Sequence, residues 1–266
     1  MKRVIIFFAI LLVGTGAAKA WSRVYDKAVL EVAYQSMDEK TQQLVVKYIG
    51  EDYTKPAGHL AWHRKNGRML ETAGWHTLHL DANLQPAAKD ENDALVQTEK
   101  ALQIIRNRKS YDNEEVAMAI RIVMNLVIDM HNLSNVKIEG IELSGTDFKV
   151  DTSKGTSGGR TAKITPYSWK SLWTSRYNTY HGAYSPQMYA EDIKIMFGNK
   201  REEFSRGSLN DWAHDIGGYT KQVHITLEQH GNQFLHPTIQ EHEELHMACL
   251  ARAAYRIAAL LNETLK

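Results

Sequence analysis

An apolar stripe near the end of the chain is the feature that most constrains its fold. Between about Thr238 and Leu265, apolar residues recur at spacings of four, three and four positions. They are Leu250, Ala254, Ile257 and Leu261. This spacing brings the side chains to one face of an α-helix. The segment is therefore predicted to be a long helix that buries one face against the rest of the protein.

Earlier segments carry the same signal. Helices are predicted over residues 24–37, 42–49, 92–106 and from 112 through at least 128, and again near 168, 186 and 208. Asp38 and Asp112 have the position of helix N-caps, and Gly50 that of a C-terminal stop. The segment 140–164 is rich in Gly, Ser and Thr and is predicted to be a loop that could hold a small hairpin. The chain is therefore predicted to be mainly α, in a single domain.

The first twenty residues are typical of a secretory signal peptide. Two basic residues are followed by an apolar run over residues 4–13 and by an Ala-Lys-Ala cleavage sequence that ends at Ala20. The run is shorter than the roughly 20 apolar residues that span a membrane, and an uncleaved anchor is the alternative. We therefore predict a signal peptide over 1–20, one mature domain over 21–266, a secreted or periplasmic location and no stable membrane anchor.

Composition restricts the kind of function. The chain has 32 basic and 31 acidic residues, and three of the basic ones lie in the signal segment. A protein that coats nucleic acid would carry a strong positive excess, so that class is disfavoured. The single cysteine, Cys249, excludes an internal disulfide and a cysteine-rich zinc site. It lies in an apolar helical stretch and is predicted to pack in the core.

Both ends of the mature chain carry a family resemblance. Residues 251–262 read Ala-Arg-Ala-Ala-Tyr-Arg-Ile-Ala-Ala-Leu-Leu-Asn, and cleavage after Ala20 leaves Trp21 as the first residue. Between them lie residues 122–135, Gly158-Gly159, Trp173 and Trp212-Ala213. In order and spacing these resemble the zinc-dependent single-strand nucleases, the fungal and plant bifunctional type related to bacterial zinc phospholipase C. The resemblance covers nearly all of residues 21–266 and implies their helical phospholipase C/nuclease-like fold.

The resemblance also implies a site for three zinc ions. In that family the metals are held by the N-terminal Trp and by His and Asp side chains. They activate a water and clamp the phosphate of the transition state. Trp21 corresponds to the terminal ligand, although a packing role for its ring is equally compatible. Asp26 stands where the family has a His and could serve as an oxygen ligand.

The next two ligand positions differ in how well they match. Arg64 replaces an Asp ligand, and a guanidinium cannot bind a metal cation. Its charge could instead occupy the emptied metal position. A His follows in the family about fifteen residues later. His79 has that spacing and is preferred, while His76, in Gly-Trp-His, has a comparable local context.

The later ligand positions are mostly replaced. Asn125, Asp129 and Asn135 stand where the family has His, Asp and His, and Asn125 shares a helix face with Asp129. A satisfied core pair is the alternative for these two residues. His131 is a spare candidate. Lys170 and Thr174 replace a later His and Asp.

The predicted site is therefore a reduced one. We predict metal ligands at Trp21, Asp26, His79 and Asp129, and weak anion-binding roles for Arg64 and Lys170. Four protein groups cannot hold three zinc ions that each take about four ligands. Zinc in reduced number is predicted, and a site without zinc is also compatible.

A second motif competes with this interpretation. His242-Glu243-Glu244-Leu245-His246 matches H-E-x-x-H, which places two His one helical turn apart with a Glu as general base. The alternative, which we favour, is a polar helix start that faces solvent.

The sequence leaves three hypotheses about function. The primary one is a secreted phosphodiester hydrolase that acts on single-stranded nucleic acid or nucleotides with an altered metal site. The second is an inactive descendant that binds a ligand or partner in the old cleft, and the third is a zinc protease.

Overall fold

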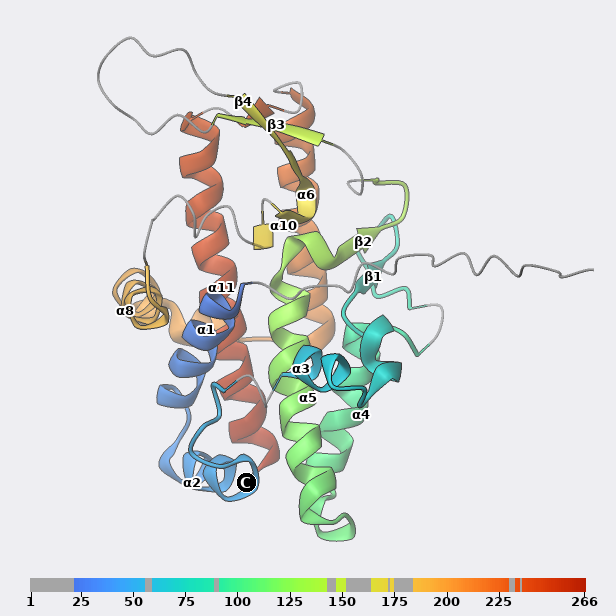
Figure 1. The fold of residues 1–266 in the computed structure, drawn as a ribbon, viewed down its shortest axis with the longest axis vertical. Coiled ribbons are helices and arrows are strands. Elements are labelled where there is room, and N and C mark those ends of the chain that lie inside the picture. Colours follow the sequence, from blue (N-terminus) through green and yellow to red (C-terminus); the bar gives the residue numbers. More distant parts are fainter. Residues whose placement is uncertain are drawn as a thin grey trace, which may run out of the picture.

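The computed structural model describes residues 22–55, 59–88, 91–142, 147–151, 164–171, 173–174, 184–229, 233–234 and 236–266. The protein is mainly helical, as the sequence predicts (Figure 1). Its α-helices are α1 (Arg23–Gln35), α2 (Glu39–Ile49), α3 (Leu60–Lys65), α4 (Ala94–Arg106), α5 (Asn113–His131), α6 (Trp169–Ser171), α8 (Pro186–Phe197), α9 (Arg201–Ser205), α10 (Leu209–Gln229) and α11 (His236–Thr264). The 3-10 turns are η2 (Leu70–Gly74), η3 (Arg108–Ser110), η4 (Leu133–Asn135) and η6 (Gly198–Lys200).

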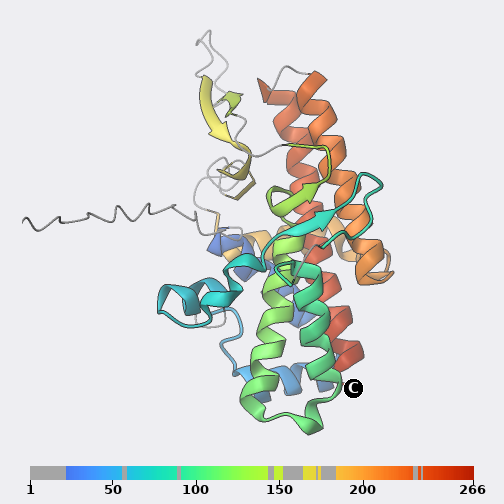
Figure 2. The same ribbon diagram turned by 90° about the vertical axis from the view of Figure 1, so that its right-hand side faces the viewer.

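Three long helices set the frame. Helices α5, α10 and α11 run roughly along the longest axis, and α4 lies beside α5 (Figures 1 and 2). Helix α1 packs against both α11 and α8. The stripe residues Leu250, Ala254, Ile257 and Leu261 of α11 are fully buried. The helix predicted from their spacing is therefore confirmed, and this face forms part of the core.

Local side chains fix where the helices begin. Asp38 caps α2 by accepting the backbone N–H of Thr41, and Gly50 ends that helix at φ 83°. Asp93 caps α4, and Asp112 forms a capping box with Glu115 at the start of α5. A side-chain oxygen in this position satisfies backbone N–H groups that have no partner within the helix.

The strands are short and form two small sheets. Strand β1 (Leu78–Leu80) pairs in parallel with β2 (Val136–Ile138). Strand β3 (Asp147–Asp151) pairs antiparallel with β4 (Ile164–Ser168) and in parallel with β5 (Gln233–Phe234). Strand β3 lies within the segment 140–164, where a small hairpin was an option, but its antiparallel partner β4 begins only at the last residue of that segment. No sequence signal predicted the β1–β2 pair.

The structure confirms the predicted burial of Cys249 but does not test the predicted signal segment. Cys249 is buried, and burial raises the pKa of its thiol to about 12, which suits a packing role. No helix among the described ranges is long and apolar enough to cross a membrane. The predicted signal segment and Trp21 lie outside the described residues, so their assignments stay predictions.

Candidate functional site

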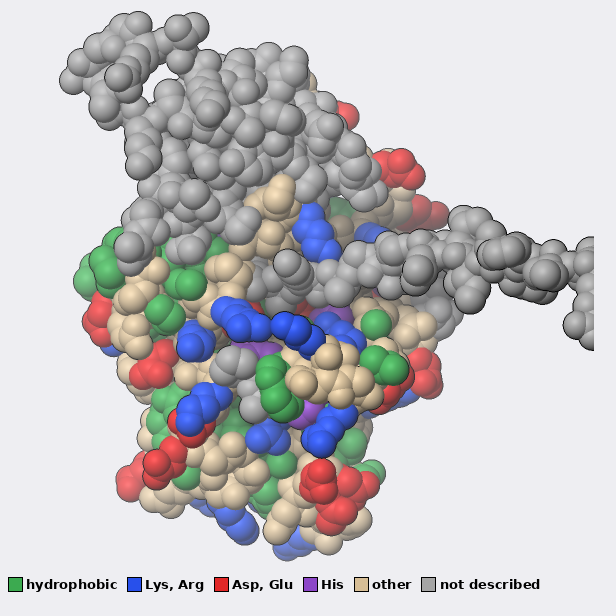
Figure 3. All heavy atoms as spheres, viewed as in Figure 1, with side chains coloured by type: hydrophobic (Ala, Val, Ile, Leu, Met, Phe, Trp, Pro, Cys, Tyr) green, Lys and Arg blue, Asp and Glu red, His purple; other side chains and the backbone are tan. Residues whose placement is uncertain are grey.

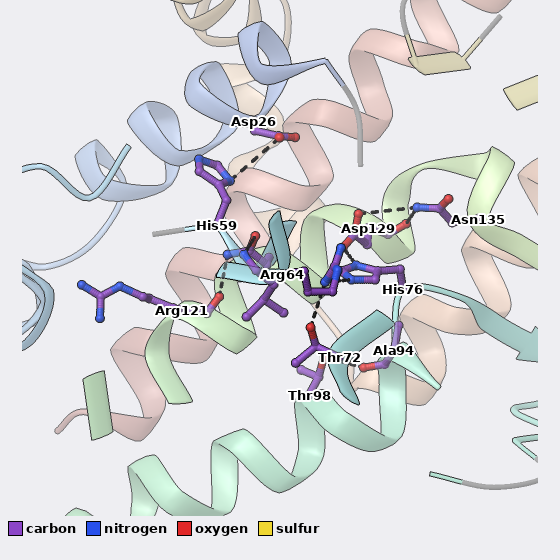
Figure 4. Close-up of polar contacts among 12 residues, drawn as sticks. Asp26, His59, Arg64, Thr72, His76, Ala94, Thr98, Arg121, Asp129 and Asn135 are labelled. Carbon is purple, nitrogen blue, oxygen red and sulfur yellow. Dashed lines mark hydrogen bonds and ion pairs between the residues drawn. The ribbon is translucent and has the colours of Figure 1, made fainter. Parts of the chain in front are cut away.

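A buried polar cluster surrounds Asp129 near the C-terminal end of α5. Figure 4 shows its members converging from segments that are far apart in the sequence. Arg64 comes from α3, His76 from the chain after η2, and Asn135 from η4. Asp129 and His76 are almost completely buried. We call these four residues, together with Asp26 and Asn125, the Asp129 cluster.

His76 bridges a carboxylate and a guanidinium. Its Nδ1 lies 2.5 Å from Asp129 Oδ2, and its Nε2 lies 2.6 Å from Arg64 Nη1. A guanidinium only donates hydrogen bonds, so His76 Nε2 accepts from Arg64 and its Nδ1–H donates to Asp129. The lone pair with which His76 could bind a metal therefore accepts the hydrogen bond from Arg64.

Arg64 is held in this position by its own surroundings. The hydroxyl of Thr72 accepts a hydrogen bond from Arg64 Nη1 at 2.8 Å, and the same hydroxyl donates to the carbonyl of Met69. Burial lowers the pKa of Arg64, and the charge of Asp129 opposes that shift. The η2 turn thus positions an acceptor that fixes the guanidinium next to His76.

Two asparagines replace expected histidines and are committed to backbone contacts. Asn125 Oδ1 accepts the N–H of Leu60 at 3.2 Å, and its amide donates to the carbonyl of Arg121 at 2.8 Å. Asn135 Nδ2 donates to the Asp129 carbonyl at 3.2 Å and lies 3.5 Å from Asp129 Oδ1. Asn125 therefore ties the start of α3 to α5, and Asn135 orients the Asp129 carboxylate.

Asp26 adds a second buried acid from α1. It is only 5% exposed, and its Oδ2 lies 3.9 Å from Nδ1 of His59. Its Oδ1 has no hydrogen-bond partner among the described residues. Burial raises the pKa of Asp26 well above its ordinary value, and the charge of Asp129 adds to this shift. A buried, poorly compensated acid is typical of functional sites.

We expect Asp26→Asn to raise the free energy of unfolding at pH 7. Because the pKa of Asp26 is higher in the folded than in the unfolded protein, the folded state loses stability as the pH rises from the unfolded-state pKa to the folded-state pKa, and the full cost is present above the latter. The neutral amide removes this cost, so the gain should shrink as the pH falls and wild-type Asp26 becomes protonated. Urea unfolding at several pH values measures it. Equal stability of both proteins at pH 7 would contradict the assignment.

Basic side chains surround the cluster. Burial lowers the pKa of His59, and the charges of Arg23 and Lys27 act in the same direction. Figure 3 shows Lys and Arg side chains gathered around His side chains on the same face of the molecule. The charge of Asp129 acts in the opposite direction on His59, which is the partner of Asp26.

The structure places His76, and not the preferred His79, beside Asp129. His79 is the middle residue of β1, and its Nδ1 lies 3.0 Å from the helix cap Asp93. Successive side chains of a strand point to opposite faces. Leu78 and Leu80 are buried, so His79 points away from them and is partly exposed. For the residue that lies beside Asp129, the local Gly-Trp-His context pointed to His76, whereas the spacing pointed to His79.

The remaining predicted positions meet at the start of α1. The backbone N–H of Ser22 donates to the carbonyl of Thr174 at 2.9 Å, and the Thr174 hydroxyl donates to the Lys170 carbonyl at 2.7 Å. Lys170 is half-buried. These contacts thus connect the segment of Lys170 and Thr174 to the start of the helix that carries Asp26.

The described residues do not fit a three-zinc site. Within the ranges that the structure describes, no three His, Cys, Asp or Glu side chains converge on a point suited to a metal ion. His76 Nε2 is occupied by Arg64, and Asn125 Oδ1 by a backbone N–H. Neutral amide oxygens are in any case poor zinc ligands.

The H-E-x-x-H pair is buried, which corrects the expectation that it faces solvent. His242 and His246 are 3% and 1% exposed. The His246 ring lies 4.8 Å from the Tyr25 ring and 5.3 Å from the Trp173 ring, and its Nε2 is 3.3 Å from the Trp173 carbonyl. Helix α11 turns this face inward because α1 packs along it. The described surroundings give His246 a packing role between aromatic rings.

His131, the spare candidate, also has a structural role. Its Nδ1 lies 2.7 Å from the Val127 carbonyl and its Nε2 lies 2.9 Å from Arg256 Nη1. Sequence reasoning missed His59 and the role of Arg256 and placed His76 only second to His79, because the partners of these residues come from distant segments.

Comparison with known proteins adds no further assignment. No protein-family model matches the chain, and no curated protein sequence matches it significantly.

Proposed function

We propose that the chain is a divergent relative of the zinc-dependent single-strand nucleases that binds a nucleotide or a similar small phosphate ester at the Asp129 cluster without hydrolysing it. The positions aligned by the resemblance support this relationship. Asp26, Arg64, Asn125, Asp129 and Asn135 come from four separate segments. The charge of Asp129 acts on both Asp26 and Arg64, Asn135 contacts Asp129, and Asn125 lies one helical turn before Asp129. We propose that the protein is secreted or periplasmic.

The contact between Arg64 and His76 carries the proposal. The guanidinium is a positive charge next to His76 and Asp129, where the resemblance implies a metal cation. Arginine binds phosphate oxygens through two parallel N–H groups. Arg64 is half-buried, and the surface around it is basic. Arg64 thus combines the charge and the donors that a phosphate needs.

One observation favours a second candidate, a phosphodiester hydrolase with a reduced metal site. Asp26 Oδ1 has no hydrogen-bond partner among the described residues, and the charge of Asp129 acts on this carboxyl group. A single bound cation would balance the negative charges of the two carboxylates. A bound metal would supply an activated water for hydrolysis. In this candidate Asp26 and Asp129 would hold the ion, and Trp21 would complete the set.

Nucleotide binding and cleavage together test the proposal. We expect the mature protein to bind adenosine monophosphate in EDTA, and Arg64→Met to weaken binding at least about tenfold through loss of charged hydrogen bonds. Calorimetry measures the affinity, and Arg68→Met, an exposed neighbour, is the matched control. Unchanged binding in Arg64→Met would refute the proposal. Zinc-dependent cleavage of single-stranded DNA that is lost in Asp129→Ala would establish the hydrolase instead.

A further inference from the structure

A groove on another part of the protein shares no lining residue with the Asp129 cluster. It has a volume of about 310 Å³ and is lined by residues of α8, η6, α9, α10 and α11. Its apolar lining consists of Phe197, Phe204, Tyr219, Leu245 and Ala248. None of the six residues of the Asp129 cluster lines it. Any ligand of this groove is therefore independent of the function proposed above.

Arg252 is the distinctive residue of this groove. Its guanidinium carbon lies 3.8 Å from the centre of the Phe204 ring and 5.1 Å from that of Tyr219. The guanidinium thus lies over the Phe204 ring and beside the Tyr219 ring. Stacking on rings uses the face of the group and leaves its N–H edge for hydrogen bonds.

The Arg252 edge has no acceptor within the described structure. Among the described residues, its guanidinium forms no hydrogen bond and no ion pair. Its charge still acts on its neighbours, since it opposes the rise that burial causes in the pKa of Tyr219 and of Cys249. A half-buried, preorganised guanidinium with an unpaired edge is a receptor for an oxyanion.

The other charges of the groove restrict the oxyanion. Lys200 also lies over the Phe204 ring, at 6.0 Å, whereas Glu203 and Glu244 line the groove with the opposite charge. The four formal charges, counting Arg252, therefore balance. A dianion such as phosphate is repelled by two carboxylates, while a single carboxylate gains the paired N–H donors of Arg252 at a smaller electrostatic cost.

We propose that this groove binds a small monocarboxylate with an aromatic or branched apolar body, its carboxylate on the Arg252 edge and its body against Phe204 and Leu245. The volume suits a ligand of this size, because small-molecule pockets begin at about 300 Å³. Planar recognition of a carboxylate is the task for which arginine surpasses lysine. The mixture of apolar walls and one oriented cation is the usual composition of a small-ligand site.

Titration of the mature protein with phenylacetate tests the proposal. We expect saturable binding by calorimetry and saturation-transfer NMR, weakened at least about tenfold by Arg252→Gln because charged hydrogen bonds are lost. Arg252→Lys keeps the charge but not the paired N–H donors of a guanidinium, and an intermediate loss is expected. Arg206→Gln, an exposed arginine of the same region, should leave the affinity unchanged. Arg64→Met should also leave it unchanged, which separates this site from the Asp129 cluster.

Three outcomes would overturn the proposal. The first is absence of phenylacetate binding at millimolar concentration. The second is equal affinity in wild type and in both folded Arg252 variants. The third is tighter binding of inorganic phosphate or of benzylamine than of phenylacetate, because either result would assign the groove to a different chemical class.

Discussion

Replacing Arg256 with methionine should lower the free energy of unfolding by about 3 kcal/mol, because two buried acceptors lose their donor. Arg256 is 2% exposed. Its Nε donates to the Phe204 carbonyl at 3.0 Å, and its Nη1 donates to His131 Nε2 at 2.9 Å. Methionine fills a similar volume but leaves both acceptors unpaired. The third partner, Asp215, is partly exposed and can be hydrated again.

The network around Arg256 joins separate helices. The residues that it contacts lie on α5, α9 and α10, while Arg256 itself belongs to α11. Its guanidinium also lies 4.9 Å from the Trp212 ring. Burial and the charge of Arg256 hold the pKa of His131 well below its ordinary value. His131 is therefore neutral in the folded protein and accepts from Arg256.

Equilibrium urea unfolding measures this effect. The matched control is Arg206→Met, since the Arg206 side chain is largely exposed and, within the described part of the chain, pairs only with Glu202. Surface changes of this kind usually alter stability by less than about 0.5 kcal/mol. An Arg256→Met protein that differs from wild type by no more than the control would contradict the structural role assigned to Arg256.

The helices were predictable because their signals are local. The stripe of α11 and the caps at Asp38 and Asp112 depend on residues within a few positions of one another. The β1–β2 pair was not predictable in this way. Each of its strands has three residues, and Leu78 and Val136 are brought together only by the packing of the helices between them. Such short segments carry no periodic signal.

In the candidate site, too, the features with local signals were predictable and those that depend on distant segments were not. The resemblance singled out Asp26, Arg64 and Asp129, and in the structure the charge of Asp129 acts on both of the others. Sequence spacing preferred His79 to His76, because the short strand that turns His79 toward Asp93 gave no signal. The partners of Arg64, which decide whether a metal can bind, depend on the η2 turn. No local pattern encodes that turn.

Arg64→Asp should convert the Asp129 cluster into a zinc site. The change removes the guanidinium from His76 Nε2 and supplies a carboxylate from the same helix. His76 would then bind through Nε2, while its Nδ1–H stays on Asp129, an arrangement that orients a metal-bound histidine. Asp26 adds a further buried acid whose Oδ1 has no partner within the described ranges. A cation therefore finds ligands where wild type holds its own positive charge.

Stability in the presence of zinc measures this conversion. A ligand that binds only the folded state stabilises it by about 2.7 kcal/mol at a hundred times its dissociation constant. We expect zinc to stabilise Arg64→Asp in this way, with much less effect on wild type. Wild type is the reference in this comparison, because any zinc that binds elsewhere on the protein stabilises both proteins equally.

The control separates a new site from a general gain in acidity. Arg68→Asp makes the same charge change at an exposed position of the same segment and should gain no zinc stabilisation. Arg64→Asp combined with His76→Gln should lose the gain, because the nitrogen ligand is gone. If wild type binds zinc as tightly as Arg64→Asp, Arg64 does not replace a metal ion, and the hydrolase with a reduced metal site becomes the better account. If only Arg64→Asp binds, a single residue separates an arginine-filled cluster from a metal centre.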